Sequence, residues 1–149
     1  MRVNTKGKGH PERAARLTVS PDGRTLSIDP ARDFIELPGG AKKFTVRHDP
    51  ASEFYWTLSN AVPERDQDRT PPDRVRNTLA LARSKDLASW TVRSVLLRHP
   101  DRSKHGFQYA DWQFDGDDII AVCRTAYDDG LGGARSAHEG ESVLAHGEQ

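Results

Sequence analysis

Apolar residues occur in short runs along this chain, rich in β-branched and aromatic side chains and separated by turn residues. Runs of this kind are typical of β-strands. No window of the chain carries the 3.6-residue apolar stripe of an amphipathic helix. The pattern therefore predicts an all-β fold. We expect strands at residues 2–5, 15–19, 25–28, 43–48, 54–60, 78–83, 91–97, 108–114 and 119–125.

Turn residues separate several neighbouring strands. Pro, Gly, Asp and Ser favour tight turns, and they cluster in "SPDG" (20–23), "DPAS" (49–52) and "DGDD" (115–118). The stretch 60–77 contains three prolines and predicts a long polar loop without a helix. The last residues, 136–149, show no strand period, so we expect an irregular tail.

Two features of the sequence recur with nearly the same spacing. Ser-x-Asp, followed by a strand, occurs at Ser20 and at Ser84, an offset of 64 residues. The turn residues Asp49 and Asp115 are 66 residues apart. One such period contains four predicted strands, and four antiparallel strands make one blade of a β-propeller.

The predicted architecture is a partial β-propeller over residues 1–135. The strands account for the end of one blade, one whole blade and the first two strands of a third. A propeller closes with at least four blades. We therefore expect this chain to be part of a larger fold, with open blade edges that favour self-association.

Three stretches carry a resemblance to a known family: "LPGGAKKFTVRHDP", "RNTLALARSKDLASWTVRSVLLRHPD" and "KHGFQYADWQFDGDDIIAVCRTAYDDGLGGA". They resemble bacterial sialidase-like glycoside hydrolases, over roughly residues 1–135. The resemblance implies a propeller fold, hydrolysis of a glycosidic bond, and a structural role for the Ser-x-Asp turns. The ending "SAHEGESVLAHGEQ" departs from the family, whose members continue with His-Asp and a further strand.

Composition narrows the possible partners. Lys and Arg together number 22, as do Asp and Glu, so the chain lacks the basic excess of a nucleic-acid-binding protein. Its apolar runs are far shorter than the roughly 18 residues of a membrane span. The first residues, "MRVNTKGKGHPER", lack the apolar core of a signal peptide, and Cys123 is the one cysteine. These features favour a cytoplasmic protein that binds neither nucleic acid nor membrane.

The sequence indicates no cofactor. Its six histidines form no HxH or HExxH pattern, so we expect no metal site. A P-loop, a Gly-x-Gly-x-x-Gly fingerprint after a strand and a Gly-x-Ser-x-Gly elbow are also missing from the sequence.

Blade topology sorts the loops into two faces. Propeller enzymes use the face where strand 1 begins and strand 2 ends. The segments 104–111 and 124–130 lie there in the third blade, and 39–43 and 58–62 in the middle blade. Asn4, Asn60 and Arg124 then occupy similar places on successive blades. The acidic turn 115–118 falls on the other face and is expected to be solvated.

The chemistry of glycoside hydrolysis selects residues on the first face. It needs a group that protonates the leaving oxygen and a second that attacks or stabilises the anomeric carbon, and sialidases use a tyrosine nucleophile. Arginine suits a sugar carboxylate. The predicted catalytic residues are Asp111, Arg124, Tyr127 and Asp128. The predicted substrate-binding residues are Gln108, Tyr109, His105, Asn60 and Lys43.

Each of these residues also has a structural interpretation. Asp111 could cap a strand end, Arg124 could pair with a nearby carboxylate, and Tyr109 and Trp112 could pack between blades. The chain could also be a non-catalytic propeller that binds carbohydrate or protein, since a fold does not determine a function. A third alternative is a remnant that associates through its unpaired edges.

Overall fold

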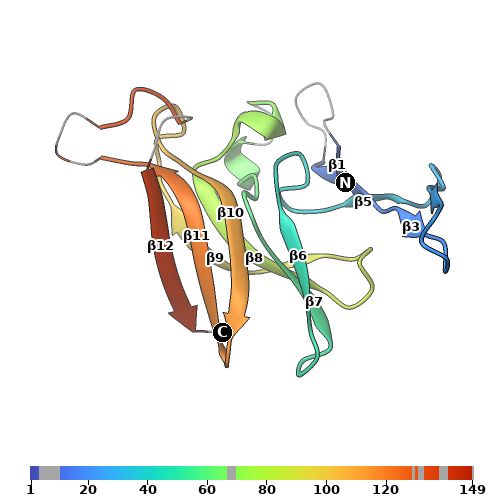
Figure 1. Ribbon diagram of the computed structural model, residues 1–149. Coiled ribbons are helices and arrows are strands. Elements are labelled where there is room, and N and C mark those ends of the chain that lie inside the picture. Colours follow the sequence, from blue (N-terminus) through green and yellow to red (C-terminus); the bar gives the residue numbers. More distant parts are fainter. Residues whose placement is uncertain (4–10, 67–69, 129, 131–132, 138–140, 149) are drawn as a thin grey trace.

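A computed structural model describes residues 1–3, 11–66, 70–128, 130, 133–137 and 141–148 (Figure 1). The described residues form four antiparallel sheets and two one-turn 3-10 helices, which confirms the all-β prediction. The strands are β1 (Arg2–Val3), β2 (Arg13–Ala15), β3 (Thr18–Val19), β4 (Leu26–Ser27), β5 (Phe34–Glu36), β6 (Thr45–Asp49), β7 (Phe54–Ser59), β8 (Thr78–Ser84), β9 (Thr91–Arg98), β10 (Gly106–Asp115), β11 (Asp118–Ala126) and β12 (Glu141–Glu148).

The central sheet has the predicted order. Strands β6, β7, β8 and β9 follow one another in space as they do along the chain, and each neighbouring pair is antiparallel. This confirms that the strands expected at 43–48, 54–60, 78–83 and 91–97 form one up-and-down sheet. β-Branched and aromatic residues fill these strands, and short turns or one long loop connect them.

The long loop between β7 and β8 is more regular than the sequence predicts. It contains the 3-10 helices η1 (Glu64–Asp66) and η2 (Pro72–Arg74). The expectation of a segment without helix was therefore wrong. Pro72 starts η2, where a proline costs no hydrogen bond because the first N–H groups of a helix have no partner within it.

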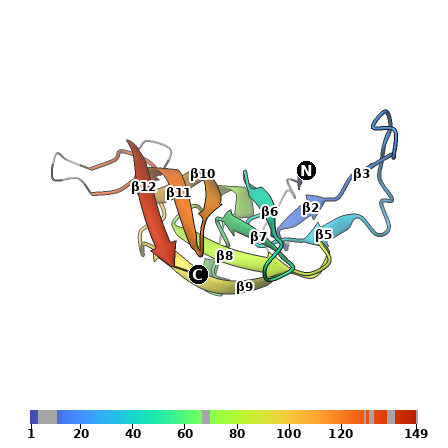
Figure 2. The ribbon, with the colours of Figure 1, turned by 60° about the horizontal axis from the view of Figure 1, so that its bottom comes forward.

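The N-terminal region forms two small sheets. One has the order β1-β2-β5, and the other is the hairpin β3-β4, which extends away from the remaining sheets (Figure 2). The strand predicted at 15–19 is divided into β2 and β3. Strand β5 was not predicted, because its three residues are too few for a period to be recognised.

The C-terminal sheet has the order β10-β11-β12. Residues 141–148 form β12, which pairs with β11 over eight positions, so the prediction of an irregular tail was wrong for these residues. The sequence of this segment has little strand character. The exposed backbone groups of β11 offer it a hydrogen-bonding edge, and tertiary pairing of this kind overrides weak local preference.

The core lies between the central and C-terminal sheets. Trp56, Leu58, Leu79 and Leu81 of the central sheet pack against a cluster from β10 and β11 that includes Phe107, Trp112, Ile119, Ala121 and Cys123. Trp112 is 3% exposed and is therefore a packing residue, as its structural interpretation expected. Figure 2 shows the two sheets as stacked layers. The outer strand β9 leaves Val95 and Leu96 about half exposed.

Candidate functional site

Polar residues gather at both ends of the sheets, and at one end they form self-contained turns. Asp86 accepts hydrogen bonds from the backbone N–H groups of Ala88 and Ser89 and from the hydroxyls of Ser84 and Ser89. These bonds, first of all those from the Ser89 and Ala88 backbone, hold the pKa of Asp86 well below its usual range. All partners lie within three residues, so this turn needs no ligand.

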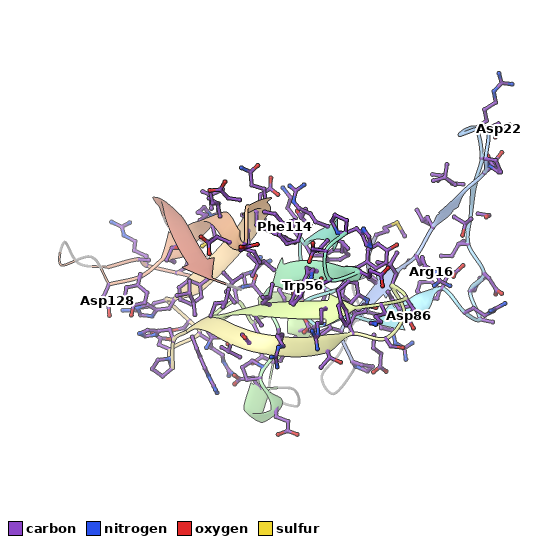
Figure 3. The ribbon with its side chains drawn as sticks, turned by 90° about the horizontal axis from the view of Figure 1, so that it is seen from below. Arg16, Asp22, Trp56, Asp86, Phe114 and Asp128 are labelled. Atoms are coloured by element: carbon purple, nitrogen blue, oxygen red, sulfur yellow. The ribbon has the colours of Figure 1, made fainter. Side chains whose placement is uncertain are left out.

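The second Ser-x-Asp turn and the β6–β7 turn are built in the same way. Asp22 accepts from the Ser20 hydroxyl and the Arg24 N–H, and Asp49 accepts from Ser52 and Ala51. The structural role expected for the Ser-x-Asp turns therefore agrees with their contacts. Figure 3 shows Asp22 and Asp86 on the opposite side of Trp56 from Asp128.

At the other end of the sheets, two arginines lie close to the ring of Tyr109. The Arg124 guanidinium carbon is 4.6 Å from the ring centroid, and that of Arg76 is 5.9 Å from it. A bulge between Gln108 and Asp111 gives Tyr109 a φ of 54°, which turns its side chain out of the strand register. We call Arg76, Tyr109 and Arg124 the arginine–tyrosine cluster.

Gln108 holds Arg124 in this cluster. The Arg124 Nη2 donates to Gln108 Oε1 at 3.1 Å, and the Gln108 amide donates to the carbonyl of Ala137. Gln108 is 1% exposed, so the pair is fixed from the protein interior. Arg124 Nε is buried without a hydrogen-bond partner in the part of the chain that the structure describes. Gln108 thus orients the Arg124 guanidinium, while the N–H group at Nε donates no hydrogen bond to the described residues.

A buried lysine, Lys42, lies close enough to Arg76 to interact with it electrostatically. Lys42 is 1% exposed and binds the Glu12 carboxylate and, at 2.8 Å, the carbonyl of Pro72. Burial lowers the pKa of Lys42, Glu12 opposes that change, and the positive charge of Arg76 adds to the lowering. Glu12 neutralises Lys42, so the cationic groups of the arginine–tyrosine cluster are Arg76 and Arg124.

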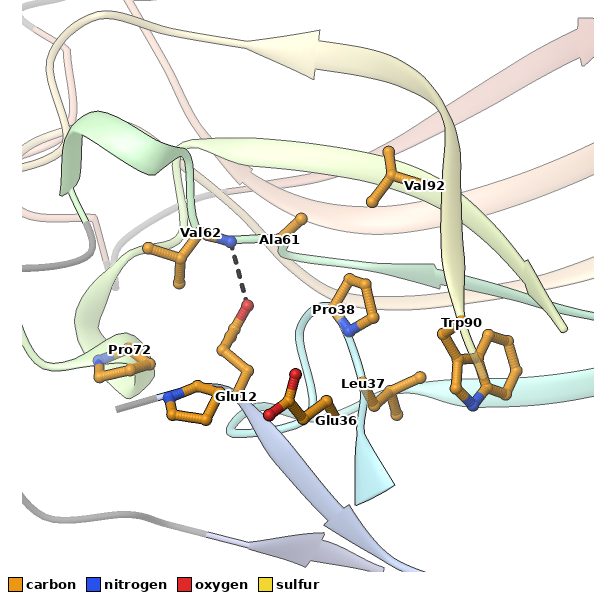
Figure 4. Close-up of a pocket in the computed structure, with 10 residues that line it drawn as sticks. Glu12, Glu36, Leu37, Pro38, Ala61, Val62, Pro72, Trp90 and Val92 are labelled. Atoms are coloured by element: carbon orange, nitrogen blue, oxygen red, sulfur yellow. Dashed lines mark hydrogen bonds between the residues drawn. The ribbon is translucent and has the colours of Figure 1, made fainter. Parts of the chain in front are cut away.

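A pocket of about 480 Å³ lies next to Glu12, lined mainly by proline and apolar side chains (Figure 4). Glu12 accepts hydrogen bonds from the backbone N–H groups of Gly39 at 2.9 Å and Val62 at 3.0 Å. Its carboxylate therefore ties the N-terminal sheet to the central sheet. Every predicted site residue lies outside the lining of this pocket.

A second group of ionisable residues, the histidine cluster, is formed by His99, Asp101, His105, Tyr127 and Asp128. The rings of His99 and His105 stack with centroids 3.5 Å apart, and the edge of Tyr127 meets both rings at 5.3 and 5.4 Å. His105 Nδ1 lies 3.4 Å from Asp101 and its Nε2 lies 3.3 Å from Asp128.

Hydrogen bonds from neighbouring segments position the histidine cluster. The Asn77 side chain donates to the His99 carbonyl at 2.6 Å. Asp101 accepts from the hydroxyl and backbone N–H of Ser103, and these bonds lower the pKa of Asp101 to about 2. His105 is 4% exposed, whereas the Asp128 side chain is 75% exposed. The cluster therefore has a buried half and an exposed half.

The carboxylate of Asp111 contacts the central sheet. Asp111 is paired with Val122 of β11, but its carboxylate accepts from Thr45 at 3.3 Å and lies 3.4 Å from Arg47, both on β6. Arg124 is paired with Gln108 and not with Tyr109, because the bulge shifts the register by one residue. Asp111 and Arg124 share no hydrogen bond or ion pair within the described structure, although both lie on the face of the hairpin that carries the exposed Val122.

The remaining predicted binding residues are less suited to a ligand. The Asn60 amide is 3% exposed and donates to the carbonyls of Arg76, Thr78 and Phe107, which links β7 to β8 and β10. Lys43 is exposed, whereas its neighbour Lys42 is the buried lysine. Asn4 lies outside the described residues.

The sequence reasoning missed Arg76, Lys42, Glu12, His99 and Asp101. It considered the loops where strand 1 begins and strand 2 ends. In an up-and-down sheet the start of strand 3 and the end of strand 4 lie at the same end, so the same argument could have included Arg76 and His99. Nothing in the local sequence indicates that Lys42 is buried.

No model of a known protein family matches this chain, and a comparison with curated proteins also finds no match. The class of the protein therefore comes from its own structure, an all-β chain of antiparallel sheets. Among the described residues, none of the helices has the length and apolar character needed to cross a membrane.

Proposed function

We propose that this chain is part of a β-propeller glycoside hydrolase of the sialidase-like kind. The strand order supports a propeller: the N-terminal sheets would supply strands 2 to 4 of one blade, β6–β9 a whole blade, and β10–β12 the first three strands of the next. In this assignment, the chain passes from the outermost strand of one blade to the innermost strand of the next blade. Successive blades of a propeller are connected in this way.

Contacts between the sheets support the same proposal. Trp112 donates to the carbonyl of Thr45 at 3.1 Å, and Thr45 donates to Asp111 at 3.3 Å. These partners are 67 and 66 residues apart, close to the repeat offset of the sequence. Residues one repeat apart meet when equivalent strands of neighbouring blades pack side by side.

The arginine–tyrosine cluster carries the proposal about substrate. Two guanidinium groups lie within 6 Å of the centre of one phenol ring, and Gln108 orients Arg124 from the interior. Arginine forms paired, charge-assisted hydrogen bonds with carboxylates. A sugar that carries a carboxylate is therefore the substrate class that this cluster fits best, with Tyr109 and the exposed Tyr127 as aromatic partners.

In this proposal, the general acid and the general base are the exposed carboxylates Asp111 and Asp128. Asp111 has a side chain that is 65% exposed, and Asp128 is 75% exposed. Asp111→Asn is then expected to reduce turnover by about 100-fold, the usual scale for a general acid or base. That measurement needs a protein in which the propeller is complete.

Binding of an anionic sugar tests the proposal on the chain itself. The chain should bind a methyl sialoside more tightly than methyl galactoside in isothermal titration calorimetry. Arg124→Ala should weaken binding of the sialoside by about 10-fold or more, because a charge-assisted bond is lost. Arg93→Ala, on the exposed strand β9, is the matched control and should leave affinity unchanged. Equal binding of both sugars by the parent chain would contradict the proposal.

Binding without hydrolysis is a second candidate function. Asp111 is already engaged by Thr45 and Arg47, which favours a structural role for its carboxylate. Sialoside binding combined with unchanged turnover in Asp111→Asn, measured on aryl glycosides, would favour this alternative.

A further inference from the structure

His105 lies between two carboxylates without a hydrogen bond to either. Asp101 is 3.4 Å from one ring nitrogen and Asp128 is 3.3 Å from the other. Both nitrogens are buried and lack a hydrogen-bond partner within the described parts of the chain. A neutral imidazole carries one N–H, so its other nitrogen directs a lone pair at a carboxylate oxygen. Such a contact is repulsive unless a proton or a metal cation lies between the two atoms.

Asp101 determines which nitrogen is available. If the Nδ1 proton points toward Asp101, the Nε2 lone pair is directed at Asp128. A carboxylate on the far nitrogen of a histidine is the usual partner of a metal-bound imidazole, because it sets the tautomer and orients the ring. The hydrogen bonds from Ser103 hold Asp101 in position for this role.

His99 supplies a third donor atom. One ligand atom from each of His99, His105 and Asp128 lies within 4.8 Å of the others. Ligands about 2.1 Å from a tetrahedral zinc ion are roughly 3.4 Å apart. His105 Nε2 and Asp128 already lie 3.3 Å apart, so the remaining separations, which are at most 4.8 Å, need to close by up to about 1.4 Å. The exposed Asp128 side chain can move inward. The His99 ring, now stacked on His105, has to turn so that its nitrogen points at the ion.

We propose that His99, His105 and Asp128 bind one divalent transition-metal ion, with Asp101 as the group that orients His105. Two imidazoles and one carboxylate are ligands that suit Zn²⁺. Sequence analysis predicted no metal site because the ligands are spread over residues 99, 105 and 128 and form no short motif. This metal site shares Asp128 with the acid and base roles proposed above, but zinc binding can be measured whether or not the chain binds or hydrolyses a sugar.

Calorimetric titration of the chelator-treated chain with ZnCl₂ at pH 7.5 tests the proposal. We expect one equivalent of zinc per chain, and with Co²⁺ the visible absorption bands of a four-coordinate site. Asp128→Asn should weaken zinc binding by at least 10-fold, and because this side chain is exposed the variant should fold like the parent. His99→Gln should have a similar effect. His48→Ala removes an exposed histidine that packs against Tyr55 and should leave zinc binding unchanged.

The Asp101→Asn variant tests whether Asp101 orients His105 or binds the metal ion itself. It should keep the stoichiometry and weaken affinity by about 10- to 100-fold, the range seen when such a partner is lost. The proposal is overturned if the parent chain binds no zinc, which would mean that a proton on His105 balances the two carboxylates. It is also overturned if Asp128→Asn and His99→Gln bind zinc as tightly as the parent. Neither variant alters the buried His105, so these outcomes do not depend on a core substitution.

Discussion

The two ends of the sheets use polar residues in opposite ways. At the end with the β6–β7, β8–β9 and β10–β11 turns, carboxylates such as Asp86 bind the backbone of their own turn. At the other end, arginine, histidine, tyrosine and lysine side chains from separate segments meet, and several buried nitrogens of Arg124 and His105 have no hydrogen-bond partner among the described residues.

This difference distinguishes structure from candidate function. A polar group whose hydrogen-bond partners all lie within three residues of it stabilises its turn, wherever that turn lies in the fold. Polar groups brought together from distant segments, with hydrogen-bonding capacity left over in a buried place, are costly to the fold. Such groups are more readily explained when a ligand completes them. By this criterion, the arginine–tyrosine and histidine clusters are the candidate sites of this chain, and the acidic turn 115–118 is not.

The largest expected effect concerns glycines with positive φ at the two ends. Gly39 has φ 82°, and a Cβ there would meet the Ser59 side chain at 2.5 Å. Gly116 has φ 60° in the β10–β11 turn, with no atom within 4 Å of such a Cβ. Gly39→Ala should destabilise by about 3 kcal/mol or more, from backbone strain and overpacking. Gly116→Ala should cost about 1 to 2 kcal/mol from strain alone.

Urea unfolding of both glycine variants measures this contrast. Equal losses of stability would show that the site end is no more tightly packed than the turn end. A smaller loss for Gly39→Ala than for Gly116→Ala would contradict the packing around Ser59 directly.

The next effect concerns Asn60, which sequence analysis placed in the binding site. Its amide donates to three backbone carbonyls from β10 and the segment that starts β8. Asn60→Ala should lower the free energy of unfolding by about 2 to 3 kcal/mol, because buried acceptors lose their donors. Gln113→Ala, exposed on β10, is the control and should change stability by less than about 0.5 kcal/mol. If the Asn60→Ala variant is as stable as the parent but no longer binds the sialoside, Asn60 is a binding residue and not a structural one.

The sequence predicts one end of this molecule better than the other, for a physical reason. Turns depend on residues close together in the chain, so "SPDG" and "SKDL" and the strand pairs they join could be found from local patterns. Strand β12 and the buried Lys42 depend on partners far along the chain. The site was predicted in part: Gln108, Tyr109 and Arg124 do lie together, but the bulge at Tyr109 and the approach of Arg76 have no local signal.

The smallest expected effect concerns acid stability at the turn end. Hydrogen bonds from Ser89, Ala88 and Ser84 lower the pKa of Asp86 in the folded protein. A lowered folded-state pKa means that the ionised group stabilises the fold above its unfolded pKa, about 3.9, and that this contribution is lost as pH falls below it. Asp86→Asn removes that dependence, so its urea midpoint should lie below that of the parent at pH 6 and approach it between about pH 4 and pH 2. Asp49→Asn should behave in the same way, because bonds from Ser52 and Ala51 also lower the pKa of Asp49. If the midpoints of parent and Asp86→Asn stay equally far apart from pH 6 to pH 2, the turn does not depend on the carboxylate charge, and the contrast between the two ends loses its electrostatic basis.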